Sequence, residues 1–227
     1  MEDIAREKMK EGLDSVERSG SITVSGEDEA FYCLSIIGQI EGHYALESNQ
    51  KSTKYDHLLP LLVALEESPK IEGVLILINT LGGDVEAGLA IAEMIASMSK
   101  PTASIVLGGG HSIGVPLAVS ADRSFIVPSA TMTIHPVRTT GLVLGVAQAF
   151  DYLNKMQDRI INFIVTHSGV SESYFREIIN KTDSLVNDIG TLLNGVEATA
   201  CGLIDEIGGI KEALDYLRKR RREMKND

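Results

Sequence analysis

The chain has 227 residues, of which 44% are hydrophobic and 5% aromatic, and it carries a formal net charge of −11 at pH 7. So acidic a chain lacks the basic surface that nucleic acid binding requires, which excludes nucleic acid as a main partner. The length predicts one domain. A core of aliphatic rather than aromatic residues favours an α/β protein with buried strands over an aromatic-rich β-sandwich.

The cysteines and the N-terminal segment indicate the cellular compartment. Cys33 and Cys201 stand far apart in the sequence, and residues 1–12 carry charges throughout, without the apolar segment of a secretion signal. No apolar run approaches the length of a membrane span. We therefore expect reduced, buried thiols, no transmembrane segment and a cytoplasmic location.

Apolar runs and turn residues predict the elements in chain order, after a polar N-terminal tail at residues 1–30. Strands are expected at 32–37, 73–79, 103–107, 124–128 and 131–135, and a strand end at 202–205. Helices are expected at 56–67, 86–98, 115–121, 146–166, from 171 onward, at 195–201 and at 210–222. The segments between them read as loops or turns at 40–54, 80–84 and 182–193. The domain then spans 31–217, followed by a basic tail at 218–227.

Strands and helices alternate through the middle of the chain. The runs at 73–79 and 103–107 are apolar except for Asn79 and Ser104, as expected for strands buried on both faces, and a helical stripe follows the first. This alternation predicts a parallel sheet with crossover helices, so the fold class is α/β.

A serine between glycines follows the strand at 103–107. The segment Gly110-His111-Ser112-Ile113-Gly114 precedes an apolar helix start. A sharp strand-to-helix turn with this pattern exposes a serine hydroxyl as a nucleophile, and the helix points amides at developing negative charge. The alternative is a glycine-rich turn with a chance serine, because one short motif is weak evidence.

A second glycine turn, Gly82-Gly83, follows the preceding strand. Carboxyl ends of parallel strands share one edge of a sheet, so one turn can present a backbone amide and the other the nucleophile, which is the arrangement of an oxyanion hole. The glycine spacings of dinucleotide sites and phosphate loops are absent at both turns, and no residues have metal-ligand spacing, so we expect no cofactor and no metal.

His135 is the expected general base. It ends an apolar strand 23 residues after Ser112, which allows it to return to the same edge of the sheet. His111 adjoins the serine, but neighbouring side chains on a turn tend to point apart. The other three histidines, His43, His57 and His167, lie in polar contexts and are expected at the surface.

Five segments form a specific combination when taken in this order: 78–83 (INTLGG), 87–91 (AGLAI), 108–114 (GGGHSIG), 126–136 (IVPSATMTIHP) and 197–205 (EATACGLID). Together they resemble the ClpP serine peptidases over roughly residues 30–215, and most of all their translocation-enhancing branch. The resemblance implies a ClpP/crotonase-like fold of stacked ββα units, with a parallel sheet and a protruding handle at 138–145. It also implies a peptide or unfolded-protein substrate, a ring-shaped homo-oligomer (a heptamer or stacked rings) and assistance to protein export.

The resemblance assigns roles to individual residues. The nucleophile falls on Ser112 and the base on His135, while the oxyanion-hole amides fall on Gly83 and Ile113. Substrate strands add at the handle, which implicates a second group of residues: Gly82, Arg138, Thr139, Thr140 and Gly141. The N-terminal thirty residues do not match the family's axial-pore segment, so docking to an unfoldase ATPase is left open.

The acid of the triad is less directly indicated. Counting back from the Glu197-Ala198 turn without gaps reaches Gly190, which has no side chain. Asp188 lies two residues earlier and is favoured here, and Asp183 is the alternative.

Three other functions compete with a serine peptidase. The shifted acid is compatible with an inactive scaffold that kept the fold. A crotonase-type acyl-CoA enzyme shares the fold and oxyanion hole, but it needs no pairing of Ser112 with His135. An α/β-hydrolase would place a histidine near the chain end after an acid, and no histidine follows His167.

Overall fold

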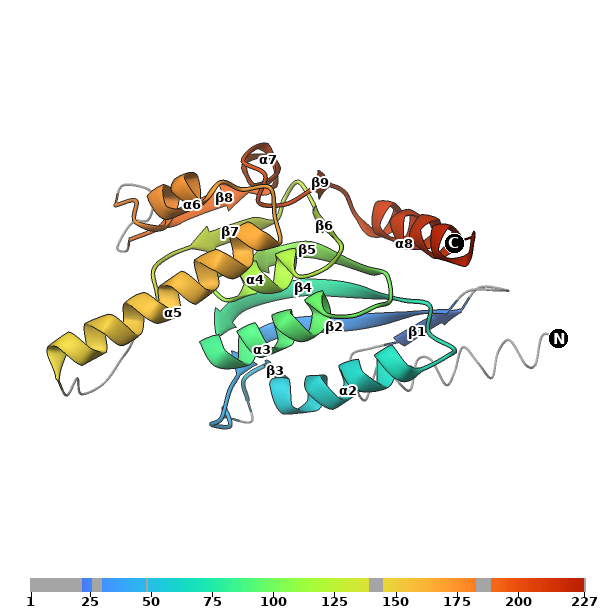
Figure 1. Ribbon diagram of the computed structural model, residues 1–227, viewed down its shortest axis with the longest axis horizontal. Helices are drawn as coiled ribbons and strands as arrows, with labels where there is room; N and C mark the ends of the chain where they lie inside the picture. The colour runs from blue at the N-terminus through green and yellow to red at the C-terminus, as the bar shows by residue number, and fades with distance from the viewer. Residues whose placement is uncertain (1–21, 26–29, 48, 139–144, 183–188, 227) are drawn as a thin grey trace.

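The computed structural model describes residues 22–25, 30–47, 49–138, 145–182 and 189–226. A mostly parallel sheet forms its centre, with helices on both faces (Figure 1). The strands are β1 (Ile22–Ser25), β2 (Ala30–Glu41), β3 (Ser52–Lys54), β4 (Gly73–Gly83), β5 (Thr102–Gly110), β6 (Arg123–Ile126), β7 (Thr131–Ile134), β8 (Thr191–Asn194) and β9 (Glu206–Ile207). The described helices are α2 (Tyr55–Glu67), α3 (Val85–Ala96), α4 (Gly114–Val119), α5 (Val146–Thr166), α6 (Glu172–Ile179), α7 (Gly195–Ala200) and α8 (Ile210–Asn226).

The main path of the sheet runs β1-β2-β4-β5-β6-β9. All pairs along it are parallel except the antiparallel hairpin of β1 with β2. At the end of β5, Gly109 pairs with Thr131 of β7, and β7 runs antiparallel to β8. The predicted α/β class with a parallel sheet is confirmed.

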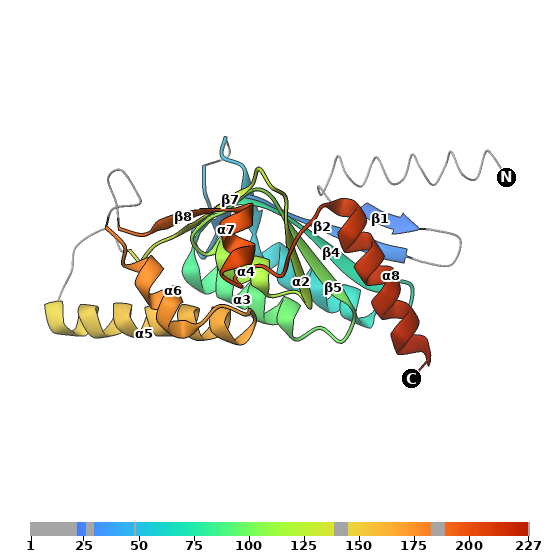
Figure 2. The same cartoon turned by 90° about the horizontal axis from the view of Figure 1, so that it is seen from above.

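Alternate residues of the central strands face two different cores. In β4, Val74, Ile76 and Ile78 join the main core under α2, α3 and α4, whereas Leu75 faces a smaller core closed by α8. Figure 2 shows α2, α3 and α5 on one side of the sheet. Helix α8 lies apart from these helices and runs across the strands. Burial on both faces explains why residues 74–78 of β4 are apolar at every position.

Several predicted boundaries were wrong. Strand β1 lies inside the expected polar tail, and β8 lies inside the expected link at 182–193. Residues 80–83 extend β4 instead of forming a turn, and the strand expected at 202–205 is β9, at Glu206–Ile207. The remaining parts of the tail, the handle and the link (1–21, 26–29, 139–144 and 183–188) lie outside the described residues.

The basic C-terminal segment and the two cysteines differ from what the sequence predicts. The basic segment after residue 217 continues α8, and its Arg221 and Lys225 form ion pairs with Glu72. Cys33 and Cys201 are free thiols, each half-buried rather than fully buried as expected. Within the described residues, no helix is long and apolar enough to cross a bilayer.

Candidate active site

The turn that carries Ser112, the expected nucleophile, joins β5 to α4; it is called the nucleophile turn below. Ser112 has φ 57°, and it is the only described residue other than glycine with a positive φ. A side chain in this left-handed region is strained and needs support from its surroundings. That support comes from backbone hydrogen bonds: the Ser112 N–H donates to the Thr133 carbonyl over 2.8 Å, and the Val115 N–H donates to the Ser112 carbonyl over 3.0 Å.

The end of β4 lies directly against this serine. A Cβ on Gly82 would come within 2.7 Å of the Ser112 Cβ, and Gly82 has φ 98°. A Cβ on Gly83 would lie 2.2 Å from the Ile40 carbonyl oxygen. Both positions therefore exclude any side chain, and the two glycine turns meet as expected.

The amide of Gly83 is oriented by its neighbour. The Asp84 N–H donates to the Ile40 carbonyl of β2 over 3.0 Å. Successive amides of an extended chain point to opposite sides, so the Gly83 N–H faces away from β2. Gly83 lines the same cavity as Ser112 and Ile113, which puts this amide on the side where an oxyanion would form.

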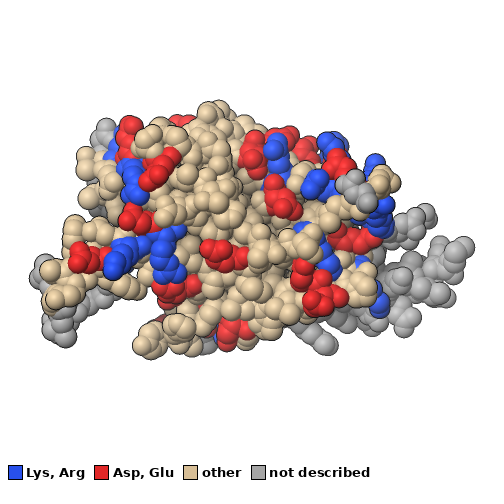
Figure 3. Space-filling view, in the orientation of Figure 1, with Lys and Arg blue, Asp and Glu red and all other residues tan. Residues whose placement is uncertain are grey.

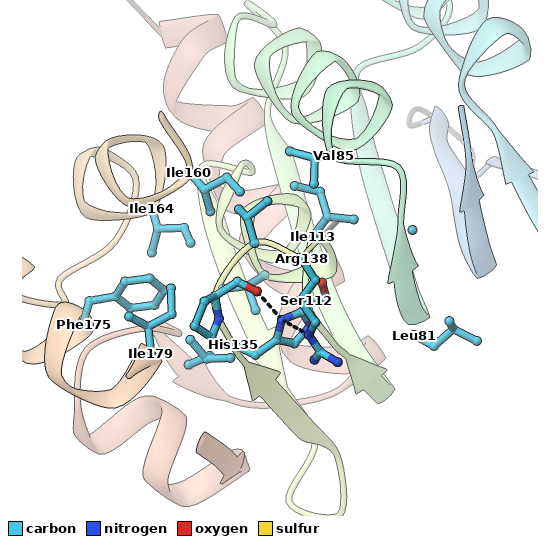
Figure 4. Close-up of a pocket in the computed structure, with 15 residues that line it drawn as sticks. Leu81, Val85, Ser112, Ile113, His135, Arg138, Ile160, Ile164, Phe175 and Ile179 are labelled. Atoms are coloured by element: carbon cyan, nitrogen blue, oxygen red, sulfur yellow. Dashed lines mark hydrogen bonds between the residues drawn. The ribbon is translucent and has the colours of Figure 1, made fainter. Parts of the chain in front are cut away.

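His135 follows β7 and lines the same cavity as Ser112. In Figure 4 the two side chains lie beside each other, with Arg138 next to them. The His135 Nδ1 is 2.7 Å from the Pro136 carbonyl oxygen, and the Arg138 Nε–H donates to the same nitrogen over 3.1 Å. These two contacts demand opposite tautomers, because a carbonyl needs a proton on Nδ1 and a guanidinium needs a lone pair there.

The position reached by counting back to the acid is structurally closed. A Cβ on Gly190 would lie 2.2 Å from the Ile134 carbonyl oxygen and 2.9 Å from the His135 Cβ. The Gly190 N–H donates to the Lys181 carbonyl over 2.7 Å. Gly190 thus lies beside both Lys181 and His135. Asp183 and Asp188 lie outside the described residues.

The cavity beside the serine has a volume of about 340 Å³. Its polar groups gather at Ser112, His135 and Arg138, and the other walls are mostly aliphatic or aromatic. The apolar wall residues are Leu81, Val85, Ile113, Val115, Ile134, Pro136, Val137, Ile160, Ile164, Phe175 and Ile179. A concave apolar site with a few convergent polar groups is typical of a binding pocket.

An ion pair joins α5, which contributes Ile160 and Ile164 to one wall of this cavity, to α3. The Arg159 guanidinium contacts Glu86 through two hydrogen bonds, of 2.7 and 3.0 Å. These bonds from Arg159 lower the pKa of the Glu86 carboxyl. The pair connects α5, which carries Ile160 and Ile164, to the first turn of α3, immediately after Gly83.

Five of the predicted site residues therefore meet at one cavity: Gly83, Ser112, Ile113, His135 and Arg138. Gly82 packs against Ser112. The other predicted residues lie outside the described residues: Thr139, Thr140, Gly141 and Asp188. No group of three metal-ligating side chains occurs among the described residues.

Sequence reasoning did not identify the cavity walls or the hydrogen bonds of His111 with Thr133. The walls had a readable signal, since Ile160 and Ile164, like Phe175 and Ile179, are spaced four residues apart on one helix face. His111 had none, because the direction of its side chain depends on the left-handed serine that follows it. Of the other histidines, His43 and His57 are exposed, and His167 is partly buried, stacked on Phe163.

A mostly parallel α/β fold with a serine, a histidine and two glycine turns at one cavity defines a protein of the ClpP-like class. Comparisons with known proteins agree. The family model "Clp protease" matches residues 28–211, and the chain belongs to this family. It is 54% identical over 206 residues to the translocation-enhancing protein TepA of Halalkalibacterium halodurans, covering 90% of this chain and 80% of that protein.

More distant relatives share the family and the fold. The ATP-dependent Clp protease proteolytic subunit 1 of Chlamydia muridarum is 32% identical over 149 residues, covering 63% of this chain and 73% of that protein. A ClpP1 mutant from Listeria monocytogenes superposes with a TM-score of 0.64 at 22% identity, covering 80% of this chain and 94% of that chain.

Proposed function

We propose that this protein is a serine endopeptidase. The observation that carries the proposal is the convergence of Ser112, His135 and Gly83 on one apolar cavity. The Ser112 Oγ attacks the carbonyl carbon of a peptide bond while its proton passes to the His135 Nε2. The amides of Gly83 and Ile113 donate to the oxyanion of the tetrahedral intermediate.

The remaining steps use the same groups. The His135 imidazolium gives its proton to the leaving amine, which departs and leaves an acyl ester on Ser112. Water, deprotonated by His135, then attacks the ester, and the acid product leaves with the serine hydroxyl restored. One of two aspartates, Asp188 in preference to Asp183, orients His135.

The cavity indicates the substrate class. Its walls suit a large apolar side chain next to the scissile bond, because they offer aliphatic surface and no acidic partner for a cation among the described lining residues. From the family resemblance we propose that a peptide pairs as an added strand with the backbone of the handle expected at 138–145. We propose an unfolded or flexible polypeptide as the natural substrate.

The setting of the enzyme is proposed from its relatives. It works as a ring-shaped homo-oligomer in the cytoplasm, and it aids protein export, as the name of the 54% identical relative suggests for that protein.

Peptide hydrolysis tests the proposal. Fluorogenic peptides that differ only at the residue before the scissile bond are offered to the wild-type protein and to Ser112→Ala. We expect cleavage after leucine or methionine in preference to aspartate or lysine, and none by the variant. Cleavage that is retained in Ser112→Ala would contradict the assignment.

A second candidate is a weakly active or inactive ClpP-fold scaffold. Two observations favour it: the acid position falls on Gly190, and the Arg138 guanidinium occupies a hydrogen-bonding site of the expected base. An assembled, folded wild-type protein that hydrolyses none of the peptides is the result expected of a scaffold.

A further inference from the structure

The side chain of His111 turns away from the cavity and reaches β7. The Thr133 N–H donates to the His111 Nδ1 over 3.0 Å, and the Thr133 Oγ1 lies 2.9 Å from the same nitrogen. In return, the Ser112 N–H donates to the Thr133 carbonyl over 2.8 Å. Two successive residues of the nucleophile turn thus hold both backbone groups of Thr133, which lies two residues before His135.

These contacts determine the protonation of the ring. A backbone amide can only donate, so the His111 Nδ1 must present a lone pair and the proton of the neutral ring is on Nε2. A protonated ring would set two N–H groups against each other. The other edge of the ring packs over β5, where a Cβ on Gly109 would lie 2.3 Å from Nε2. Burial of the ring lowers the pKa of His111, which is consistent with the neutral form.

The backbone of His111 reaches two further parts of the site. Its N–H donates to the Thr80 carbonyl of β4 over 3.1 Å, and its carbonyl accepts from the Gly114 N–H over 2.8 Å. The Thr80 Oγ1 in turn accepts from the Gly82 N–H over 3.0 Å. His111 therefore connects the oxyanion turn, the start of α4 and the strand that carries the expected base.

We propose that His111 is a positioning residue whose Nδ1 lone pair sets the placement of Ser112 relative to His135. The proposal rests on the proposed peptidase function and adds a residue that acts through Ser112 and Thr133 without touching substrate. The strained φ of Ser112 is the reason that such positioning contacts are needed, since this conformation persists only where several contacts determine it. Misplacement of reacting groups by about 1 Å can reduce a rate on the order of 100-fold.

Two variants of nearly equal shape separate the lone pair from packing. In His111→Asn the side-chain oxygen can accept from the Thr133 N–H, whereas in His111→Leu nothing can. We expect His111→Asn to react with a fluorophosphonate probe at close to the wild-type rate. His111→Leu should react about 100-fold more slowly, with kcat reduced and KM nearly unchanged. The same two substitutions at the exposed His57 serve as matched controls and should change nothing.

Hydrogen exchange at the Thr133 amide supplies a readout that does not depend on activity. Exchange should be slow in the wild type and in His111→Asn, and faster in His111→Leu at equal global stability. Equal reactivity of the Leu and wild-type proteins would overturn the proposal, as would equal losses in both variants that follow their melting temperatures. If the wild-type protein never reacts with the fluorophosphonate, both the peptidase function and the positioning role are wrong. Slow exchange of the Thr133 amide in that unreactive protein would show that the contact between His111 and Thr133 is structural only.

Discussion

Gly190 lies against His135 so closely that a Cβ there would approach the His135 Cβ to 2.9 Å. The residue also has φ 137°, which side chains rarely adopt. The site where a triad acid would be expected by position is thus filled by backbone. An acid can come only from elsewhere in the chain, and the two candidates, Asp183 and Asp188, lie outside the described residues.

The first prediction concerns Asp183 and Asp188, the two candidates for the acid that orients His135. Asp188→Asn should lower kcat on the order of 100- to 10,000-fold, because an unoriented His135 spends its time in the wrong tautomer. Asp183→Asn is the matched control and should leave kcat near the wild-type value. Steady-state hydrolysis of one peptide measures both. The reverse ranking would transfer the role to Asp183, and no effect in either variant would remove both aspartates from the mechanism.

The second prediction concerns Arg138. Its Nε–H donates to the His135 Nδ1, and this contact competes with the Pro136 carbonyl for the same nitrogen. The tautomer that Arg138 favours carries its proton on Nε2, which then cannot act as the base. Arg138→Ala should therefore raise the rate of fluorophosphonate labelling several-fold. Arg123→Ala, which removes a guanidinium that pairs with Asp205 and Glu206 away from the site, is the control. A slower rate in Arg138→Ala would instead assign Arg138 a supporting role in catalysis or binding.

The third prediction concerns the apolar cavity. Ile160→Phe adds bulk to a half-buried wall residue on α5 and should raise KM for peptides with a large apolar residue before the scissile bond. Peptides with alanine at that position should be affected little, so the preference should shift about 10-fold. Val63→Phe, at an exposed position of α2, is the control. An unchanged preference would place the bound side chain in a different pocket.

The fourth prediction follows from the neutral His111. Burial holds its pKa in the folded protein below the ordinary value of 6.5. The unfolded chain therefore binds the extra proton first as pH falls, and folding stability is lost from about pH 6.5 downward, through the folded-state pKa. Between about pH 8 and about pH 5, the melting temperature of His111→Asn should fall less than that of the wild type. Parallel curves would show that His111 does not contribute to the acid sensitivity.

The central sheet could be predicted from the sequence because its signal is local. Residues 74–78 are apolar throughout, and the structure buries alternate members in two cores, as it does for β5. The two glycine turns were predicted to meet because parallel strands end at one edge. The expected base could be selected from five histidines because only His135 ends a strand at a suitable distance.

Two of the strands that the sequence did not predict, β8 and β9, form because they pair with strands far away in the sequence. Strand β8 has the sequence Thr-Leu-Leu-Asn and is a strand because it pairs with β7, and β9 is a two-residue strand paired with Phe125 and Ile126. Neither has enough periodicity to be recognised alone. The contacts of His111 with Thr133 likewise depend on the positive φ of Ser112 and the register of β7, which a sequence pattern does not encode.

The most direct test of the account is labelling of the assembled protein with a fluorophosphonate, followed by mass spectrometry to locate the adduct. We predict one adduct per chain, on Ser112, with no labelling of Ser112→Ala and strongly slowed labelling of His135→Ala. A folded, assembled wild type that stays unlabelled, or an adduct on any other residue, would contradict the claim that Ser112 is an activated nucleophile.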